Sequence, residues 1–170
     1  MIIRLATLDD LDDIWKLRCE TQELLKSRHI DQWQYIDPTK ETFMKDILEH
    51  EFYVLIDHKE LKGMMAIKSG IEDTYLKIYD GKWRLDLPYL TIHRLAVKKD
   101  LLGSQAAKQL MDYSDVIAKE KGISYMRIDT HKDNRYAIKL FENHGYVYCG
   151  WINLNQKKGD IKRLAYDKIL

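Results

Sequence analysis

One continuous stretch, residues 89–146, constrains the fold of this chain more than any other part of it. It opens with Tyr89–Val97, an alternating run rich in β-branched residues that predicts a strand. Apolar residues then recur at helical spacing over residues 106–118. Ile123–Asp129 predicts a second strand, and Asn134–His144 predicts a second helix. Strand, helix and strand in this order form a βαβ unit, so we expect two parallel neighbouring strands joined by a right-handed crossover.

The turn between the first of these strands and its helix carries a functional signal. The first turn of a helix has backbone N–H groups without partners, and the aligned peptide dipoles make it locally positive. Small residues let an anion approach these groups closely, and the turn contains Gly103, Ser104, Ala106 and Ala107. The segment could therefore hold a phosphate, although the same glycine would also serve a turn that binds nothing.

Length and charge limit the classes of function. The chain has 170 residues, of which 45% are hydrophobic and 32% charged, as in globular proteins. With only two prolines and no linker-like segment, we expect one domain over residues 1–170. Lys and Arg number 28 against 27 Asp and Glu. A net charge of +1 argues against nucleic acid or an anionic membrane as the main partner, because both require a concentrated basic surface.

The N-terminal residues and the cysteines indicate an intracellular protein. The chain runs from Met1 directly into Asp9 and Asp10, without the apolar segment of a secretion signal. Cys19 and Cys149 lie far apart and match no metal-binding or redox spacing. We therefore expect a cytoplasmic location, no bound metal, and cysteines that serve in packing.

The remaining segments complete a mixed α/β (α+β) pattern. Residues 71–87 are polar and irregular, and we expect an excursion between strands that could form a lid over a site. The order of elements is strand, two helices, two strands, then the βαβ unit with its second helix, and two final strands. This order predicts about seven strands and about four helices. The outer segments are strands at 2–6, 52–56, 61–69, 146–152 and 161–169, and helices at 11–26 and after Thr39.

Two runs within this order resemble the GNAT N-acetyltransferase superfamily. Leu90-Thr-Ile-His-Arg-Leu-Ala-Val97 looks like the central strand of that fold. Residues 128–146 are similar to the family segment D-T-x-x-x-N-x-x-A-x-x-L-Y-E-x-x-G-F, which is the more specific match. Asp31-Gln32-Trp33 also looks like the acceptor-side loop of a bacterial branch of the family. The resemblance covers nearly the whole chain and implies a sheet that is splayed between its two parallel middle strands.

The resemblance also implies acetyl-CoA as the co-substrate. Its pantetheine arm would pair with the main chain of Leu95, Ala96 and Val97 as an added half-strand. Asn134, Ala137 and Phe141 would approach it from the other side of the gap. The pyrophosphate would bind the helix start, on the amides of Leu102, Gly103, Ser104, Gln105, Ala106 and Ala107.

Three residues depart from the family pattern. The phosphate loop of the family runs Arg/Gln-x-x-Gly-x-Gly/Ala, whereas this chain has Leu102 at the first position and Gln105 at the central glycine. A glutamine keeps its own N–H, but its side chain could crowd a phosphate, and the positive side chain is lost. Phe141 aligns with the tyrosine that often protonates the departing thiolate, and a phenyl ring has no proton to give.

His93 is the first candidate for the base that an attacking amine requires. It lies two residues before the expected thioester site, where a main-chain N–H near Leu95 would stabilise the oxyanion. His93 could equally make a hydrogen bond within the sheet. Gln32 and Trp33 could form a wall of the amine pocket, or pin the loop to the core.

Arg94 could bind an acidic substrate or pair with an acidic neighbour across the sheet. His131 is a further candidate, although histidines in loops are often only solvated. Asn134 could contact the coenzyme and also cap its helix.

These observations lead to the hypothesis of an acetyl-CoA-dependent N-acetyltransferase that acts on the amine of a small molecule or peptide. The degenerate loop and Phe141 leave open a non-catalytic coenzyme-A-binding regulatory domain. A protein-interaction domain that has lost the coenzyme is a third alternative. The final hairpin offers an edge through which two copies could form a homodimer.

Overall fold

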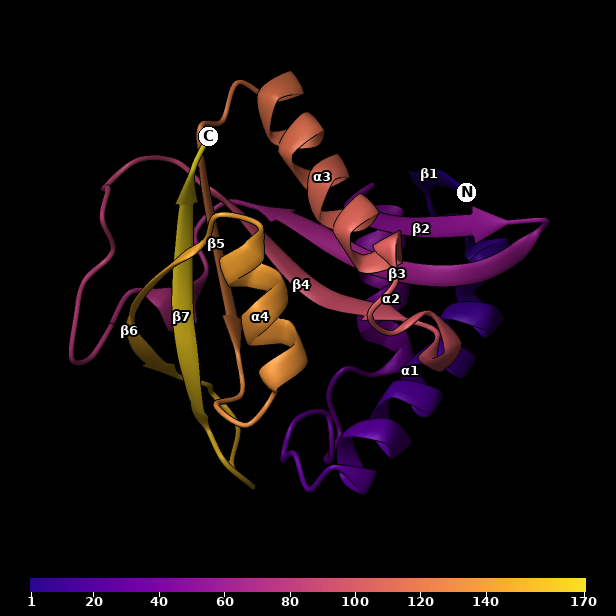
Figure 1. Ribbon diagram of the computed structural model, residues 1–170, viewed down its shortest axis with the longest axis horizontal. Coiled ribbons are helices and arrows are strands. Elements are labelled where there is room, and N and C mark those ends of the chain that lie inside the picture. Colours follow the sequence, from indigo (N-terminus) through magenta and orange to yellow (C-terminus); the bar gives the residue numbers. More distant parts are fainter.

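The computed structural model describes residues 1–170 as one seven-stranded mixed sheet with four α-helices, as the sequence predicts (Figure 1). The strand order is β1-β2-β3-β4-β5-β7-β6, and only β4 and β5 pair in parallel. The strands are β1 (Ile2–Leu5), β2 (Phe52–Asp57), β3 (Glu60–Ser69), β4 (Leu90–Val97), β5 (Tyr125–Thr130), β6 (Val147–Asn153) and β7 (Lys162–Ile169). The helices are α1 (Leu11–Ser27), α2 (Lys40–Leu48), α3 (Gln105–Glu120) and α4 (Arg135–Asn143).

Helices cover both faces of the sheet, with α3 and α4 in front and α1 and α2 behind in the view of Figure 1. Successive side chains of a strand point to opposite faces, so a strand covered on both sides must be apolar throughout. In β2, Tyr53 and Leu55 pack into the core under α3 and α4, whereas Phe52 and Val54 pack into the core under α1 and α2. The continuous apolar run of β2 is thus explained by two hydrophobic cores.

The parallel strands β4 and β5 diverge soon after they pair. Their register contains only two residue pairs, Leu90 with Met126 and Thr91 with Arg127. Further along, β4 carries a bulge, because Met64 of β3 lies opposite Ala96 while Ala66 lies opposite His93. Arg94 takes up the extra residue with a φ of 55°. The gap implied by the family resemblance is therefore present, and the edge of β4 that faces β5 has no strand partner beyond Thr91.

Residues 71–87 form the expected excursion between β3 and β4, but most of this segment does not act as the lid that the sequence allowed. Tyr79 makes a β-bridge with Trp151 of β6, and Arg84 forms an ion pair with the buried Asp167 of β7. Gly81 approaches the carbonyl of Cys149 so closely that a Cβ would lie 1.9 Å from its oxygen. These contacts fix the segment on the sheet, and only its first residues reach a cavity.

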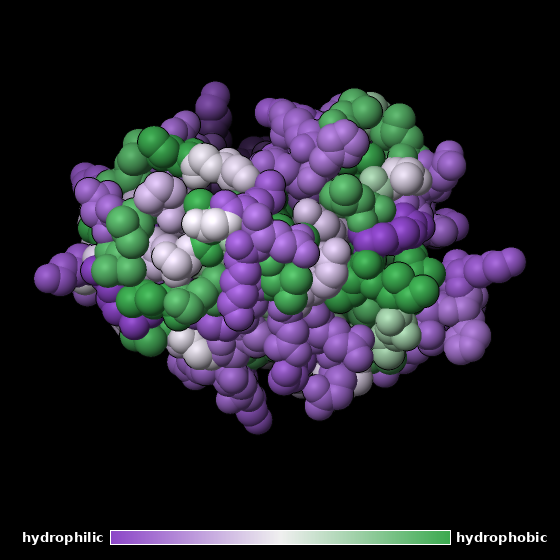
Figure 2. All heavy atoms as spheres, turned by 90° about the horizontal axis from the view of Figure 1, so that it is seen from above, coloured by the Kyte–Doolittle hydropathy of each residue, from purple (hydrophilic) through white to green (hydrophobic).

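The surface is mixed in character. Hydrophilic side chains are interspersed with apolar ones on the face seen in Figure 2. None of the helices combines the length and the apolar composition that crossing a membrane would require.

Candidate active site

Two hollows meet where β4 and β5 diverge. One is a groove of about 470 Å³ that is lined by the end of α1, the end of β4, the start of α3 and one face of α4. The other is a cavity of about 310 Å³ that is lined by β4, β5, the start of α4 and the loop after α1. Both are lined by Leu95 from β4 and by Asn134 and Ala137 from the start of α4. A long ligand in the groove could therefore present one end to a second ligand in the cavity.

The groove contains the predicted helix start. Ser104 caps α3 by accepting a hydrogen bond from the amide of Ala106 at 3.2 Å, and Gly103 enables the turn with a φ of 77°. The Gln105 side chain is exposed. Three further amides at this turn find no acceptor within the chain, namely those of Gly103, Gln105 and Ala107. Unpaired amides at the positive end of a 16-residue helix are suited to hold an anion.

The charges along the groove have one sign. Its lining includes Arg28, Lys108 and Lys139 and no Asp or Glu. Lys108 pairs with Asp112 at 2.6 Å, and Arg28 lies 4.1 Å over the ring of Tyr136. Lys139 makes no ion pair. These side chains supply positive charge that Leu102 does not, so the residues present fit a phosphate-bearing coenzyme despite the departures in the loop.

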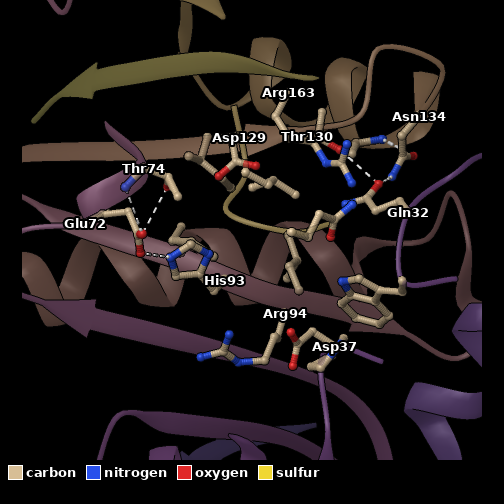
Figure 3. A pocket seen from close by; sticks show the side chains of 18 of the residues that line it. Gln32, Asp37, Glu72, Thr74, His93, Arg94, Asp129, Thr130, Asn134 and Arg163 are labelled. Atoms are coloured by element: carbon tan, nitrogen blue, oxygen red, sulfur yellow. Dashed lines mark hydrogen bonds and ion pairs between the residues drawn. The ribbon is translucent and has the colours of Figure 1, made fainter. Parts of the chain in front are cut away.

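The cavity contains a histidine–carboxylate pair that connects β4 to the excursion (Figure 3). Nε2 of His93 lies 3.0 Å from Oε2 of Glu72. The other oxygen of Glu72 accepts hydrogen bonds from the hydroxyl of Thr74 at 3.0 Å and from its amide at 3.4 Å. The contact with His93 lowers the pKa of Glu72 to about 2. Glu72 is therefore ionised near neutral pH, so Nε2 of His93 donates to it and Nδ1 is left free to accept a proton.

Gln32 and Trp33 lie in the cavity wall, next to Asn134. Oε1 of Gln32 accepts a hydrogen bond from Nδ2 of Asn134 at 3.0 Å. Oδ1 of Asn134 accepts from the amide of Ala137 at 3.3 Å, so this residue also caps α4. The two roles that the sequence left open for Asn134 are compatible, and its amide connects the acceptor loop to the start of α4.

Three other candidates occupy less open positions. Arg94 lines the cavity, but its Nε donates to Asp46 of α2 at 2.7 Å, and a second nitrogen of the guanidinium pairs with the same carboxylate. His131 is buried and hydrogen-bonded to Asp160 at 2.8 Å, and it lines neither hollow. Phe141 lines the cavity with its ring packed against Tyr166.

Sequence reasoning missed Glu72, Arg163 and Asp37 as lining residues of the cavity. Glu72 lies 21 residues before His93 in a segment without periodic pattern, so no sequence signal connected them. Arg163 follows the lysine-rich turn before the last strand, where a solvated side chain is the simplest expectation, yet it is only 3% exposed. Asp129 also lines the cavity, and its Oδ2 accepts from the hydroxyl of Tyr75 at 2.6 Å.

One acidic cluster outside these hollows has the spacing of a cation site. Asp46, Glu49 and Glu51 bring carboxylate oxygens within 4.8 Å of one another. The ammonium of Lys68 lies among them, at 2.9 Å from Asp46 and 2.9 Å from Glu49. The positive charge that such a cluster requires is thus provided by the chain itself.

Comparisons with known proteins agree with this geometry. A family model described as the acetyltransferase (GNAT) family matches residues 11–146. A crystal structure of a GNAT-family acetyltransferase from Streptococcus agalactiae is 31% identical, with a TM-score of 0.86 over 99% of this chain and 95% of that chain. A putative acetyltransferase from Staphylococcus aureus is 26% identical, with a TM-score of 0.74 over 99% of each chain.

A more distant structure shares the fold alone. It is the PaiA N-acetyltransferase of Thermoplasma acidophilum in complex with coenzyme A, which is 18% identical, with a TM-score of 0.72 over 99% of this chain and 98% of that chain. No curated protein sequence matches the chain. The family model nevertheless spans most of the chain, from α1 to the start of β6, and the splayed strands, the helix start and the segment around Asn134 all lie within it. The chain belongs to the acetyltransferase (GNAT) family.

Proposed function

We propose that the protein is an acetyl-CoA-dependent N-acetyltransferase that transfers the acetyl group directly to the amine of an acceptor. The observation that carries this proposal is the meeting of the basic groove and the cavity at Leu95, within two residues of the His93–Glu72 pair. In this proposal the coenzyme lies in the groove, the acceptor lies in the cavity, and the protein works in the cytoplasm.

The residues around the groove would hold the coenzyme through three kinds of contact. The unpaired edge of β4 from Leu95 to Val97 offers main-chain groups to the pantetheine arm. The free amides at the start of α3 and the side chains of Lys139 and Arg28 attract its phosphates. The coenzyme itself supplies an activated acetyl thioester.

His93 would act as the base. An acceptor amine is mostly protonated near neutral pH, so it must lose a proton before its nitrogen can attack a carbonyl carbon. Nδ1 of His93 accepts this proton, and the ionised Glu72 stabilises the resulting imidazolium and fixes the orientation of the ring. The pair thus resembles the histidine and carboxylate of other acyl-transfer enzymes in role, with the amine as the nucleophile.

The transfer step forms one bond and breaks another. The nitrogen–carbon bond forms as the carbon–sulfur bond breaks, and a main-chain N–H near Leu95 stabilises the oxygen that carries negative charge in between. The nitrogen releases its second proton to solvent as the amide forms. The departing thiolate takes a proton from solvent in this proposal, because Phe141 stands at the position of the usual tyrosine and has no acidic proton. The products are an N-acetylated amine and the free thiol of the coenzyme.

Release of free thiol tests the proposal. The protein is incubated with acetyl-CoA and a broad panel of amines, and thiol is measured over time together with the acetylated product. We expect thiol release that depends on an amine and that is lost in the His93→Gln variant. Coenzyme binding without turnover of any amine would instead favour a non-catalytic coenzyme-binding domain, the alternative that Leu102, Gln105 and Phe141 support.

A further inference from the structure

Two side chains of opposite charge lie in the acceptor cavity without an ion-pair partner. Asp129 of β5 and Arg163 of β7 come from neighbouring strands and both line the cavity (Figure 3). Neither side chain forms an ion pair within 4.0 Å, although Arg163 feels the negative charges of Asp129, Asp160 and Asp31 from farther away, that of Asp129 most strongly. Among the other charged groups of the lining, Glu72 contacts His93 and Arg94 contacts Asp46. Asp37 also has no ion-pair partner, but it is exposed at the rim of the cavity.

The guanidinium of Arg163 is buried and only partly satisfied. Nη1 donates to the carbonyl oxygens of Asp160 at 2.6 Å and Lys162 at 3.0 Å, and Nη2 makes a long contact of 3.4 Å with that of Asp31. Nε has no acceptor in the chain and is not among the polar atoms that are sealed from solvent without a partner. One donor of this almost fully buried cation therefore keeps access to solvent, and Arg163 lines the cavity, where an anion would offset part of the cost of burying the guanidinium.

Asp129 is held in place with one oxygen free. Its Oδ2 accepts from the hydroxyl of Tyr75 at 2.6 Å, and the ring of Tyr75 is 1% exposed. Its Oδ1 receives no hydrogen bond from the chain and is not sealed off. A carboxylate fixed in this way presents a negative charge to the cavity at a defined position, as an ammonium group requires.

We infer that the acceptor is a free α-amino acid, whose carboxylate binds Arg163 and whose amino group lies between Asp129 and His93. This inference rests on the proposed function and specifies its substrate class. A zwitterion complements both free charges, whereas a diamine would leave Arg163 without a partner, and the N-terminus of a peptide has no α-carboxylate. A cavity of about 310 Å³ lies at the small end of ligand sites, which also favours a single amino acid over a peptide.

Matched acceptors test the inference in the wild-type protein. Each of the 20 common amino acids is compared with its carboxamide and with the amine that lacks the carboxyl group, and kcat/KM for acetylation is measured. For the preferred side chain we expect the free acid to exceed both analogues by about tenfold to a hundredfold, as for a hydrogen bond to a charged group. Amides or simple amines that react as well as the acids would overturn the inference.

Variants assign the effect to the two residues. We expect Arg163→Lys, which keeps the charge but removes the planar fork, to reduce the preference for acid over amide at least fivefold. Asp129→Asn should raise KM for every amine with the acid-to-amide ratio unchanged. Asp133→Asn serves as the control, because Asp133 is exposed and lines neither hollow. An unchanged acid-to-amide ratio in a folded Arg163→Lys protein would contradict the assignment.

A binding measurement separates this inference from the proposed function. Titration calorimetry of the wild-type protein, with and without saturating coenzyme A, compares the preferred amino acid with its carboxamide. Tighter binding of the acid supports the inference even if no acetylation occurs, in which case the proposed function alone fails. Acetylation of amines together with equal binding of acid and amide would overturn the inference and leave the proposed function standing.

Discussion

The imidazole of His93 and the carboxylate of Glu72 act together in the proposed catalysis: His93 accepts the proton of the amine, and Glu72 stabilises the imidazolium that forms. Replacing His93 by Gln removes the group that accepts the proton of the amine, and general-base catalysis typically contributes about 10²–10⁴-fold. We therefore predict that kcat falls by at least about 100-fold in His93→Gln, while the affinity for coenzyme A changes less than about twofold. Steady-state kinetics and calorimetry give the two values, with His58→Gln, at an exposed turn, as the control.

The pH dependence of stability provides a second prediction at this scale. The folded-state pKa of Glu72 is about 2, against an ordinary value of 4.5. A depressed pKa stabilises the fold above the unfolded value, so this contribution is present above pH 4.5 and is lost as pH falls from 4.5 towards 2. Because Glu72 is only partly buried and solvent screens its contact with His93, the contribution is on the order of 1 kcal/mol. Denaturant unfolding should show Glu72→Gln less stable than wild type at pH 6, with the difference shrinking by pH 3. A difference that stays constant would contradict the shift.

Helix α4 presents Lys139 to the coenzyme groove on the face that also carries Tyr136 and Leu140. Lys139 has no ion-pair partner, so Lys139→Met should remove an attraction for a phosphate without disturbing another contact. We predict that the dissociation constant for coenzyme A rises about fivefold at low salt, and less at high salt because salt screens the charge. Arg135→Met, one turn earlier on the same helix and outside the groove, should have no such effect. Equal affinities in both variants would show that Lys139 does not contribute.

The excursion between β3 and β4 offers a matched pair of glycines. A Cβ at Gly81 would collide with the backbone of Cys149, whereas Gly70 has open space around it and only a φ of 91° to maintain. Alanine at Gly70 should cost about 1 kcal/mol of unfolding free energy, as expected for a strained backbone. Gly81→Ala should cost at least twice as much, because the segment must move away from β6. Chemical denaturation compares the two, and similar losses would refute the close packing.

At the scale of the whole molecule, the sequence predicts the fold well because its strongest patterns are local. The alternation of Leu90–Val97 and the helical spacing after Ser104 each lie within one element. The run from Ile128 to Tyr146 covers the end of β5 and the whole of α4. Together they define the βαβ unit, and the right-handed crossover then places β4 beside β5. The family resemblance implied the gap between β4 and β5. The bulge at Arg94 of β4, which lies beside this gap, was not predicted, because no local pattern in the sequence reveals it.

The cavity was harder to predict because its charges come from segments distant in the chain. Glu72 belongs to a polar stretch without periodicity, and Arg163 reaches the cavity only because β7 pairs with β5. The role of Arg94 depends on Asp46, a residue of α2 whose approach to β4 is a tertiary contact. The acceptor-side residues Gln32 and Trp33 were identifiable only through the resemblance.

One measurement tests the central claim that the gap between β4 and β5 holds the coenzyme. Coenzyme A is titrated into the isotopically labelled protein, and the backbone amide signals are followed by NMR. We predict saturable shifts concentrated at residues 95–97 and 103–108, with little change at β1 and β6, the outer strands of the sheet. Absence of shifts at millimolar coenzyme A, or shifts confined to residues outside the gap, would contradict the account.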